Sequence, residues 1–171
     1  CKLIRQAVSE AKGEQQQPDV DIQLDVPLDA YVPRDFLKSE LMRLAMYKRI
    51  AQIGDNDGYA DLLDEFQDRY GELPVPVLNL MQLALIRAYA ARAQLASVTI
   101  RDGKATLQFD ENAQPDGMQL LAVLAGEADA KLTATAPASI QLLYKKASAA
   151  EIVAKLPQFL YRLMHCILPA D

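Results

Sequence analysis

The chain has 171 residues, of which 51% are hydrophobic and 24% are charged, and its net charge is −5. This composition is that of a folded globular domain and excludes a disordered chain, and the acidic total argues against a general nucleic-acid binder, which needs clustered lysine and arginine. No apolar run approaches the roughly 18–20 residues of a membrane helix, and Cys1 and Cys166 belong to no paired motif, so we expect a cytoplasmic protein without a zinc site or a disulfide.

The first residues have the pattern of a helix followed by a linker. Residues 1–12 carry apolar side chains at helical spacing, Gly13 ends the pattern, and the polar run Glu-Gln-Gln-Gln-Pro comes next. Because the chain enters this pattern at Cys1 without a methionine, we expect a piece of a longer protein, with a processed chain as the alternative. We therefore divide it into residues 1–17, a preceding helix and linker, and residues 18–171, a single domain.

One strand and three helices are predicted in the first half of the domain. Residues 21–26 alternate apolar and polar side chains, as in a half-buried strand. Helical spacing follows over residues 35–53, over a segment that ends at Gly71, and over residues 74–95. The loop Gly-Asp-Asn-Asp-Gly separates the first two helices. In the first helix we expect Leu37, Leu41, Leu44 and Ala45 to lie on one apolar stripe.

The second half predicts a small antiparallel sheet with two helices. Asp102-Gly103 between apolar segments is typical of a type I′ hairpin. Ser148 can cap a final helix, which Pro157 should kink or split. The expected elements are strands 98–100 and 105–109, a helix over 117–124, strands 131–135 and 139–144, and the final helix. The predicted class is α+β, with a layer of three helices packed with a small, mostly antiparallel sheet and a C-terminal helix.

Motifs for catalysis or cofactor binding are missing from the sequence. His165 and Cys166 are neighbours on a predicted helix, where their side chains diverge by about 100° and cannot form a nucleophilic pair. The acidic residues from Asp55 to Asp61 lack the spacing of a calcium loop, which makes a helix-capping loop the better interpretation. The glycines form no phosphate-binding loop. We predict a domain that is not an enzyme and that has neither a cofactor nor a metal.

The most informative segment is the helix that ends at Gly71. At about 100° per residue, Leu62, Phe66 and Tyr70 share a core face. Glu65, Asp68 and Arg69 lie together beside that face as a charged ridge. The simplest interpretation is an ordinary helix surface with one Glu65–Arg69 pair. Gly71 would then close the helix in a left-handed conformation, and Pro74 would begin the next one.

Three blocks of sequence together resemble one protein family. Residues 65–74, Glu-Phe-Gln-Asp-Arg-Tyr-Gly-Glu-Leu-Pro, resemble the motif E-L-x-D-R-F-G-x-L-P of the C-terminal domain of bacterial transcription-repair coupling factors (TRCF). Residues 21–33 are similar to an acidic strand followed by D-A-Y-I-P, and residues 43–51 are similar to R-L-x-x-Y-[KR]-[KR]-I-A. Phe66 and Tyr70 are conservative changes. The resemblance is specific from about residue 21 to residue 100 and weaker beyond.

This resemblance implies a regulatory domain of a superfamily-2 DNA translocase that recognises stalled RNA polymerase, moves it off DNA and recruits UvrA. The domain would dock on the UvrB-homology module of the same protein through Glu65, Asp68 and Arg69. Docking would mask the UvrA-binding surface and restrain ATP hydrolysis and DNA binding until polymerase engages. Residues 1–17 would then be the end of the motor module's helix with its linker.

Two other classes of function stay open at this point. One is a nucleic-acid-binding module that uses the helix carrying Arg43, Lys48 and Arg49, together with Tyr47. Its weakness is the acidic total and the lack of an aromatic and basic platform. The other is an enzyme for a small molecule, which would require a deep pocket with perturbed ionisable groups.

Overall fold

Helices and strands are largely segregated along the chain. The computed structural model describes residues 22–127, 129–133 and 137–167; the predicted helix over residues 1–12, the linker and the boundary between residues 17 and 18 lie outside them. The predicted α+β class is confirmed. The described elements are β1 (Gln23–Asp25), α2 (Glu40–Ala51), α3 (Asn56–Tyr70), α4 (Val75–Arg92), β2 (Leu95–Arg101), β3 (Lys104–Phe109), α5 (Gly117–Ala125), β4 (Ala130–Thr133), β5 (Ser139–Leu143) and α6 (Ala149–Met164).

The five described strands form one mixed sheet in the order β1-β2-β3-β5-β4. The pairing of β1 with β2 is parallel, and the other pairings are antiparallel. Asp102 and Gly103 both have positive φ, 51° and 74°, so the predicted hairpin is confirmed with the backbone of a type I′ turn. Along β3 and β5 the alternate side chains Leu107, Ile140 and Leu142 are buried, which gives the sheet one core face.

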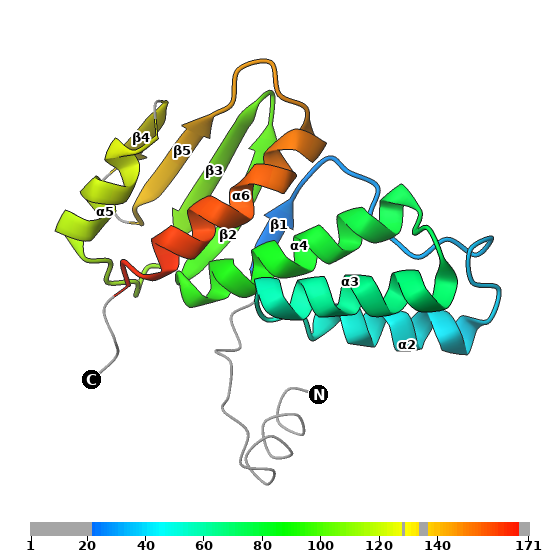
Figure 1. Ribbon diagram of the computed structural model, residues 1–171. Helices are drawn as coiled ribbons and strands as arrows, with labels where there is room; N and C mark the ends of the chain where they lie inside the picture. The colour runs from blue at the N-terminus through cyan, green and yellow to red at the C-terminus, as the bar shows by residue number, and fades with distance from the viewer. Residues whose placement is uncertain (1–21, 128, 134–136, 168–171) are drawn as a thin grey trace, which may run out of the picture.

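Helices α4 and α6 cover that core face (Figure 1). Helix α6 begins at a capping box, in which the Ser148 hydroxyl accepts from the Glu151 N–H and the Glu151 carboxylate accepts from the Ser148 N–H. Pro157 is buried inside α6 and the helix runs through it, so the predicted split is wrong. Burial of one face of α6 against the sheet and α4 outweighs the missing proline N–H, because packing supplies most helical stability in proteins.

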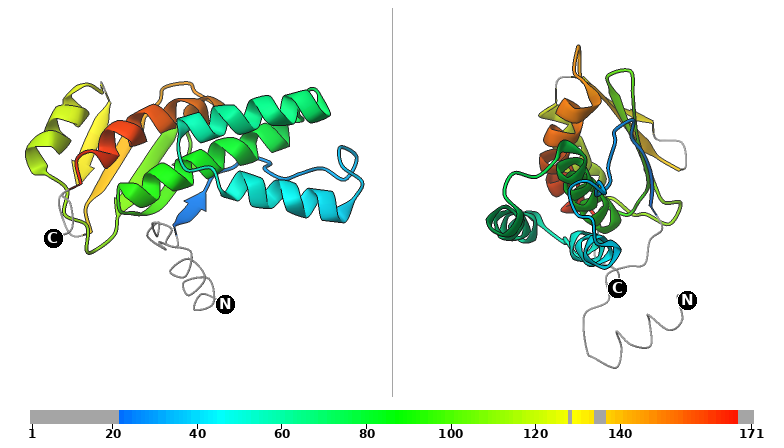
Figure 2. Two further views of the ribbon diagram at one scale, coloured as in Figure 1. Left: turned by 60° about the horizontal axis from the view of Figure 1, so that its bottom comes forward. Right: turned by 90° about the vertical axis from the view of Figure 1, so that its right-hand side faces the viewer.

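Helices α2 and α3 form a further layer on α4, beside the sheet (Figure 2). The extent predicted for α2 is wrong, and of the predicted stripe only Leu37, which precedes the helix, is buried. The Ser39 hydroxyl caps the helix by accepting from the Met42 N–H, so α2 begins at Glu40, after a turn. Its core side chains are Met46 and Ile50, and three apolar residues of the same helix are exposed: Leu41 by 79%, Met42 by 45% and Leu44 by 51%.

Candidate functional site

Helix α3 presents the predicted charged ridge of Glu65, Asp68 and Arg69. At its start, the Asp55 carboxylate accepts from the Gly58 N–H at 2.7 Å, which confirms the helix-capping loop. At its end, Gly71 adopts a φ of 79° and donates to the Gln67 carbonyl oxygen.

The apolar side of α3 faces the core. Leu62 and Phe66 are buried there, as predicted, and the Tyr70 ring contacts the Phe66 ring edge to face. Pro74 is the N-cap of α4 rather than part of its first turn. The two fixed ends and the buried face therefore set which α3 side chains point outward.

Glu65 pairs with Arg49 of α2 and not with Arg69, so the expected pair within one helix is wrong. The Arg49 guanidinium donates to both Glu65 carboxylate oxygens, at 2.7 and 2.9 Å. These hydrogen bonds, and to a lesser degree the charge of Arg69, hold the pKa of Glu65 below its ordinary value, and the same contact raises the pKa of Arg49. The Arg49–Glu65 bridge joins α2 to α3 and fixes where this carboxylate points.

Asp68 and Arg69 lie exposed on the surface of α3. Both side chains are exposed, and neither forms an ion pair with another described residue. The ridge thus holds one carboxylate already oriented by a neighbouring helix, one unpaired carboxylate and one unpaired guanidinium. Such an arrangement can meet a partner surface of alternating charge.

The cations of α2 mostly hold the domain together. Besides the Arg49–Glu65 bridge, the Arg43 guanidinium donates to the carbonyl oxygens of Leu37 and Lys38 at 2.7 and 3.0 Å. The Tyr47 hydroxyl accepts from the Val32 N–H at 2.8 Å. A phosphate backbone would have to compete with these bonds, so the geometry of α2 speaks against the nucleic-acid-binding alternative.

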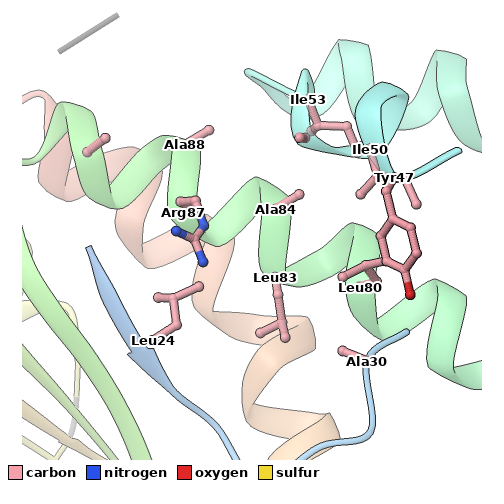
Figure 3. Close-up of a pocket in the computed structure, with 12 residues that line it drawn as sticks. Leu24, Ala30, Tyr47, Ile50, Ile53, Leu80, Leu83, Ala84, Arg87 and Ala88 are labelled. Carbon is pink, nitrogen blue, oxygen red and sulfur yellow. The ribbon is translucent and has the colours of Figure 1, made fainter. Parts of the chain in front are cut away.

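A hollow among the described residues has a lining without catalytic groups. It has a volume of about 630 Å³, lies between α2, α4 and β1, and is lined by apolar side chains, Tyr47 and Arg87 (Figure 3). Its lining contains no carboxylate, histidine or cysteine. Proton transfer and nucleophilic attack both need such groups at hydrogen-bonding distance from a substrate.

His165 and Cys166 lie apart from the charged ridge, at the end of α6. The His165 ring packs edge to face on Tyr161, and burial raises the pKa of the Cys166 thiol. In the part of the chain that the structure describes, no group of three or more His, Cys, Asp or Glu residues is arranged to hold a metal ion. Among the same residues, no helix has the length and apolar composition that crossing a bilayer requires.

Sequence reasoning missed two parts of this surface. Arg49 lies 16 residues before Glu65, so helical spacing could not pair them. Its place in the block of residues 43–51 was the only available indication of a role. The exposure of Leu41 and Leu44 was also missed, because their spacing fits a core stripe as well as a surface stripe.

The comparisons with known proteins all lead to one family. The model of the TRCF domain matches residues 26–120. The transcription-repair-coupling factor of Myxococcus xanthus is 30% identical to this chain over 99% of its length. The transcription-repair-coupling factor of Mycobacterium tuberculosis (strain CDC 1551 / Oshkosh) is 33% identical over 58% of this chain. The transcription-repair-coupling factor of Bacillus subtilis (strain 168) is 28% identical over 70% of this chain. The chain spans only 8–14% of the length of these relatives.

The fold agrees with a solved structure, the crystal structure of the C-terminal domain of a transcription-repair coupling factor. The TM-score is 0.75 at 23% identity, and the match covers 86% of this chain and 94% of that one. The chain therefore belongs to the TRCF domain family, the C-terminal domain of transcription-repair coupling factors.

Proposed function

We propose that this chain is a regulatory docking domain of a DNA translocase that couples transcription to repair. It binds the UvrB-homology module of the same protein through Glu65, Asp68 and Arg69. The contact covers the UvrA-binding surface and restrains ATP hydrolysis and DNA binding, and it opens when stalled RNA polymerase engages. The observation that carries the proposal is the exposed charged ridge on α3, whose Glu65 is held in place by Arg49.

A contact that must open suits a surface of this kind. Exposed charges contribute orientation and association rate more than affinity, and interfaces between domains of one chain are commonly polar and transient. The tether between the domains raises their effective concentration, so a modest interface is enough to keep the contact closed. The Arg49–Glu65 bridge already fixes one carboxylate of the charged ridge. The loss of side-chain conformational entropy on docking is therefore smaller than for a free Glu65.

The proposal predicts that charge reversal at the charged ridge activates the parent protein. Asp68→Arg combined with Arg69→Glu should raise UvrA binding and basal ATP hydrolysis by about 5-fold or more, the lower end of ordinary coupling between sites. Both residues are exposed, so the free energy of unfolding should change by only about 0.5 kcal/mol or less. The measurements are UvrA titration and steady-state ATPase assays on the full-length protein.

Glu111→Arg is the matched control, because it reverses an exposed carboxylate that lies outside α3. It should leave UvrA affinity and ATP hydrolysis at wild-type values. Unchanged UvrA affinity in the double variant, with the fold intact, would contradict the proposed function.

A further inference from the structure

The outward side of α2 exposes three large apolar side chains. Leu41 and Leu44 are 79% and 51% exposed and lie three residues apart, on one side of the helix, and Met42 beside them is 45% exposed. Core packing does not explain these side chains, because the buried side chains of α2 are Met46 and Ile50. We call Leu41, Met42 and Leu44 the α2 apolar face. Contiguous apolar surface of this kind commonly marks an interaction site.

A groove continues this face toward α3. The α2–α3 groove has a volume of about 480 Å³ and is lined on the α2 side by Met42, Ala45 and Met46 and on the α3 side by Phe66 and Tyr70. The Arg49–Glu65 bridge crosses between the same two helices. The groove is thus an apolar depression that lies directly beside the charged ridge.

The rim of the α2–α3 groove is cationic. Lys48, Arg49 and Arg69 all line it, and among the described residues the only carboxylate bonded to any of them is Glu65, on Arg49. This rim therefore carries excess positive charge in a chain whose net charge is −5. It favours an occupant that brings a carboxylate next to its apolar side chain.

We propose that the α2–α3 groove and the α2 apolar face bind an apolar anchor of the docking partner, and that a carboxylate beside this anchor meets Lys48 and Arg69. This inference rests on the proposed function and deepens it. Arg69 belongs both to the charged ridge and to the rim of the groove, so one docked partner covers both. The interface then has an apolar centre on α2 and a charged border on α3.

Interface energetics give the reason for such a centre. Ion pairs between exposed side chains contribute little net affinity, because water screens them and long side chains lose freedom. Most binding energy in protein interfaces comes from a few apolar or aromatic anchors in desolvated pockets, surrounded by polar groups that exclude water. Glu65, Asp68 and Arg69 have the properties of that polar border, and the groove has the properties of the pocket.

The test is a calorimetric titration of the 171-residue chain against the isolated UvrB-homology module. The variant Leu41→Ser with Leu44→Ser should weaken binding about tenfold or more, which is the size of an anchor effect. Lys48→Glu should weaken binding and also reduce its dependence on salt. The matched control is Met118→Ser with Leu121→Ser on α5, where the side chains are 84% and 61% exposed but lie on another element. It should bind like the wild type.

The outcomes separate this inference from the proposed function. If Asp68→Arg binds the module like the wild type, the proposed function fails and the inference, which rests on it, falls with it. If Asp68→Arg weakens binding but the Leu41/Leu44 and Lys48 variants bind like the wild type, the inference is overturned and the proposed function stands. Equal losses in the α2 and α5 variants would also overturn it, since the effect would not be specific to the groove.

Discussion

Helices α2 and α6 both carry apolar side chains but bury them to different degrees. Helix α6 lies across the sheet and against α4, whereas α2 lies against α4 and α3, away from the sheet (Figure 1). In α2 only Met46 and Ile50 are buried. In α6 the buried residues are Ile152, Val153, Leu156, Pro157, Phe159, Leu160 and Leu163. The comparison teaches that helical periodicity identifies an apolar stripe but not what covers it.

The two helices are also held in place by different means. Helix α6 is fixed by burial of its apolar side and by its capping box. Helix α2 buries only Met46 and Ile50 and is also held by polar side chains. Arg43 bonds to the preceding turn, Tyr47 bonds to the loop after β1, and Arg49 bonds to α3. This second mode leaves apolar side chains of α2 uncovered. We infer that α6 supplies stability and that α2 supplies contact surface.

The largest expected effect is on the free energy of unfolding, and it should differ between a leucine of α6 and a leucine of α2. Leu156→Ala in α6 should lower the free energy of unfolding by about 2–5 kcal/mol, because Leu156 is fully buried and its removal leaves a cavity. Leu44→Ala in α2 should change it by about 0.5 kcal/mol or less, because the side chain is half exposed. Chemical denaturation of the 171-residue chain measures both. Equal losses in the two variants would contradict the division of roles between α6 and α2.

A smaller effect is expected at the turn of the β2–β3 hairpin. Gly103 has a φ of 74°, and a Cβ atom there would lie 3.0 Å from the Tyr144 carbonyl oxygen. Gly103→Ala should therefore cost about 1–3 kcal/mol. Gly117→Ala, in the first turn of α5, is the control, because a Cβ there meets no atom within 4 Å and the φ is not positive. It should be neutral or slightly stabilising. Thermal unfolding of both variants checks the contrast, and equal stability of the two would refute it.

Local chemistry explains what could be predicted from the sequence. The Asp102-Gly103 hairpin, the Asp55 cap and the Ser148 cap each depend on residues within a few positions of one another, and all three are present. The α+β class followed from the change of period along the chain. The ridge on α3 was also located correctly, since Leu62 and Phe66 fix which side of the helix faces inward.

Tertiary contacts explain what could not be predicted. Met46 and Ile50 form a second apolar stripe on α2, and only the position of α4 decides that this stripe is the buried one. The Arg49–Glu65 bridge depends on how two helices are placed, which no local pattern encodes. Proline disfavours a helix interior, so the local sequence predicted a break at Pro157. The helix continues through Pro157 because α6 packs on the sheet and α4.

The smallest expected effect concerns the pH dependence of the Arg49–Glu65 bridge. The folded-state pKa of Glu65 lies below its ordinary value of about 4.3, so the stability that the bridge adds is present above that value and is lost as the pH falls through the folded-state pKa. Arg49→Met removes the principal cause and should move the Glu65 midpoint up toward the ordinary value. An NMR titration of the Glu65 carboxyl carbon measures this midpoint.

Lys48→Met is the control for that titration, because Lys48 is the neighbouring cation on α2 and makes no ion pair with Glu65. It should leave the Glu65 midpoint where it is in the wild type, although the groove proposal expects the same substitution to weaken partner binding. The two variants thus separate the internal role of α2 from its external one. An Arg49→Met chain with an unchanged midpoint would show that Arg49 does not hold Glu65, and the placement of α2 would then depend on Arg43, Tyr47 and the buried Met46 and Ile50.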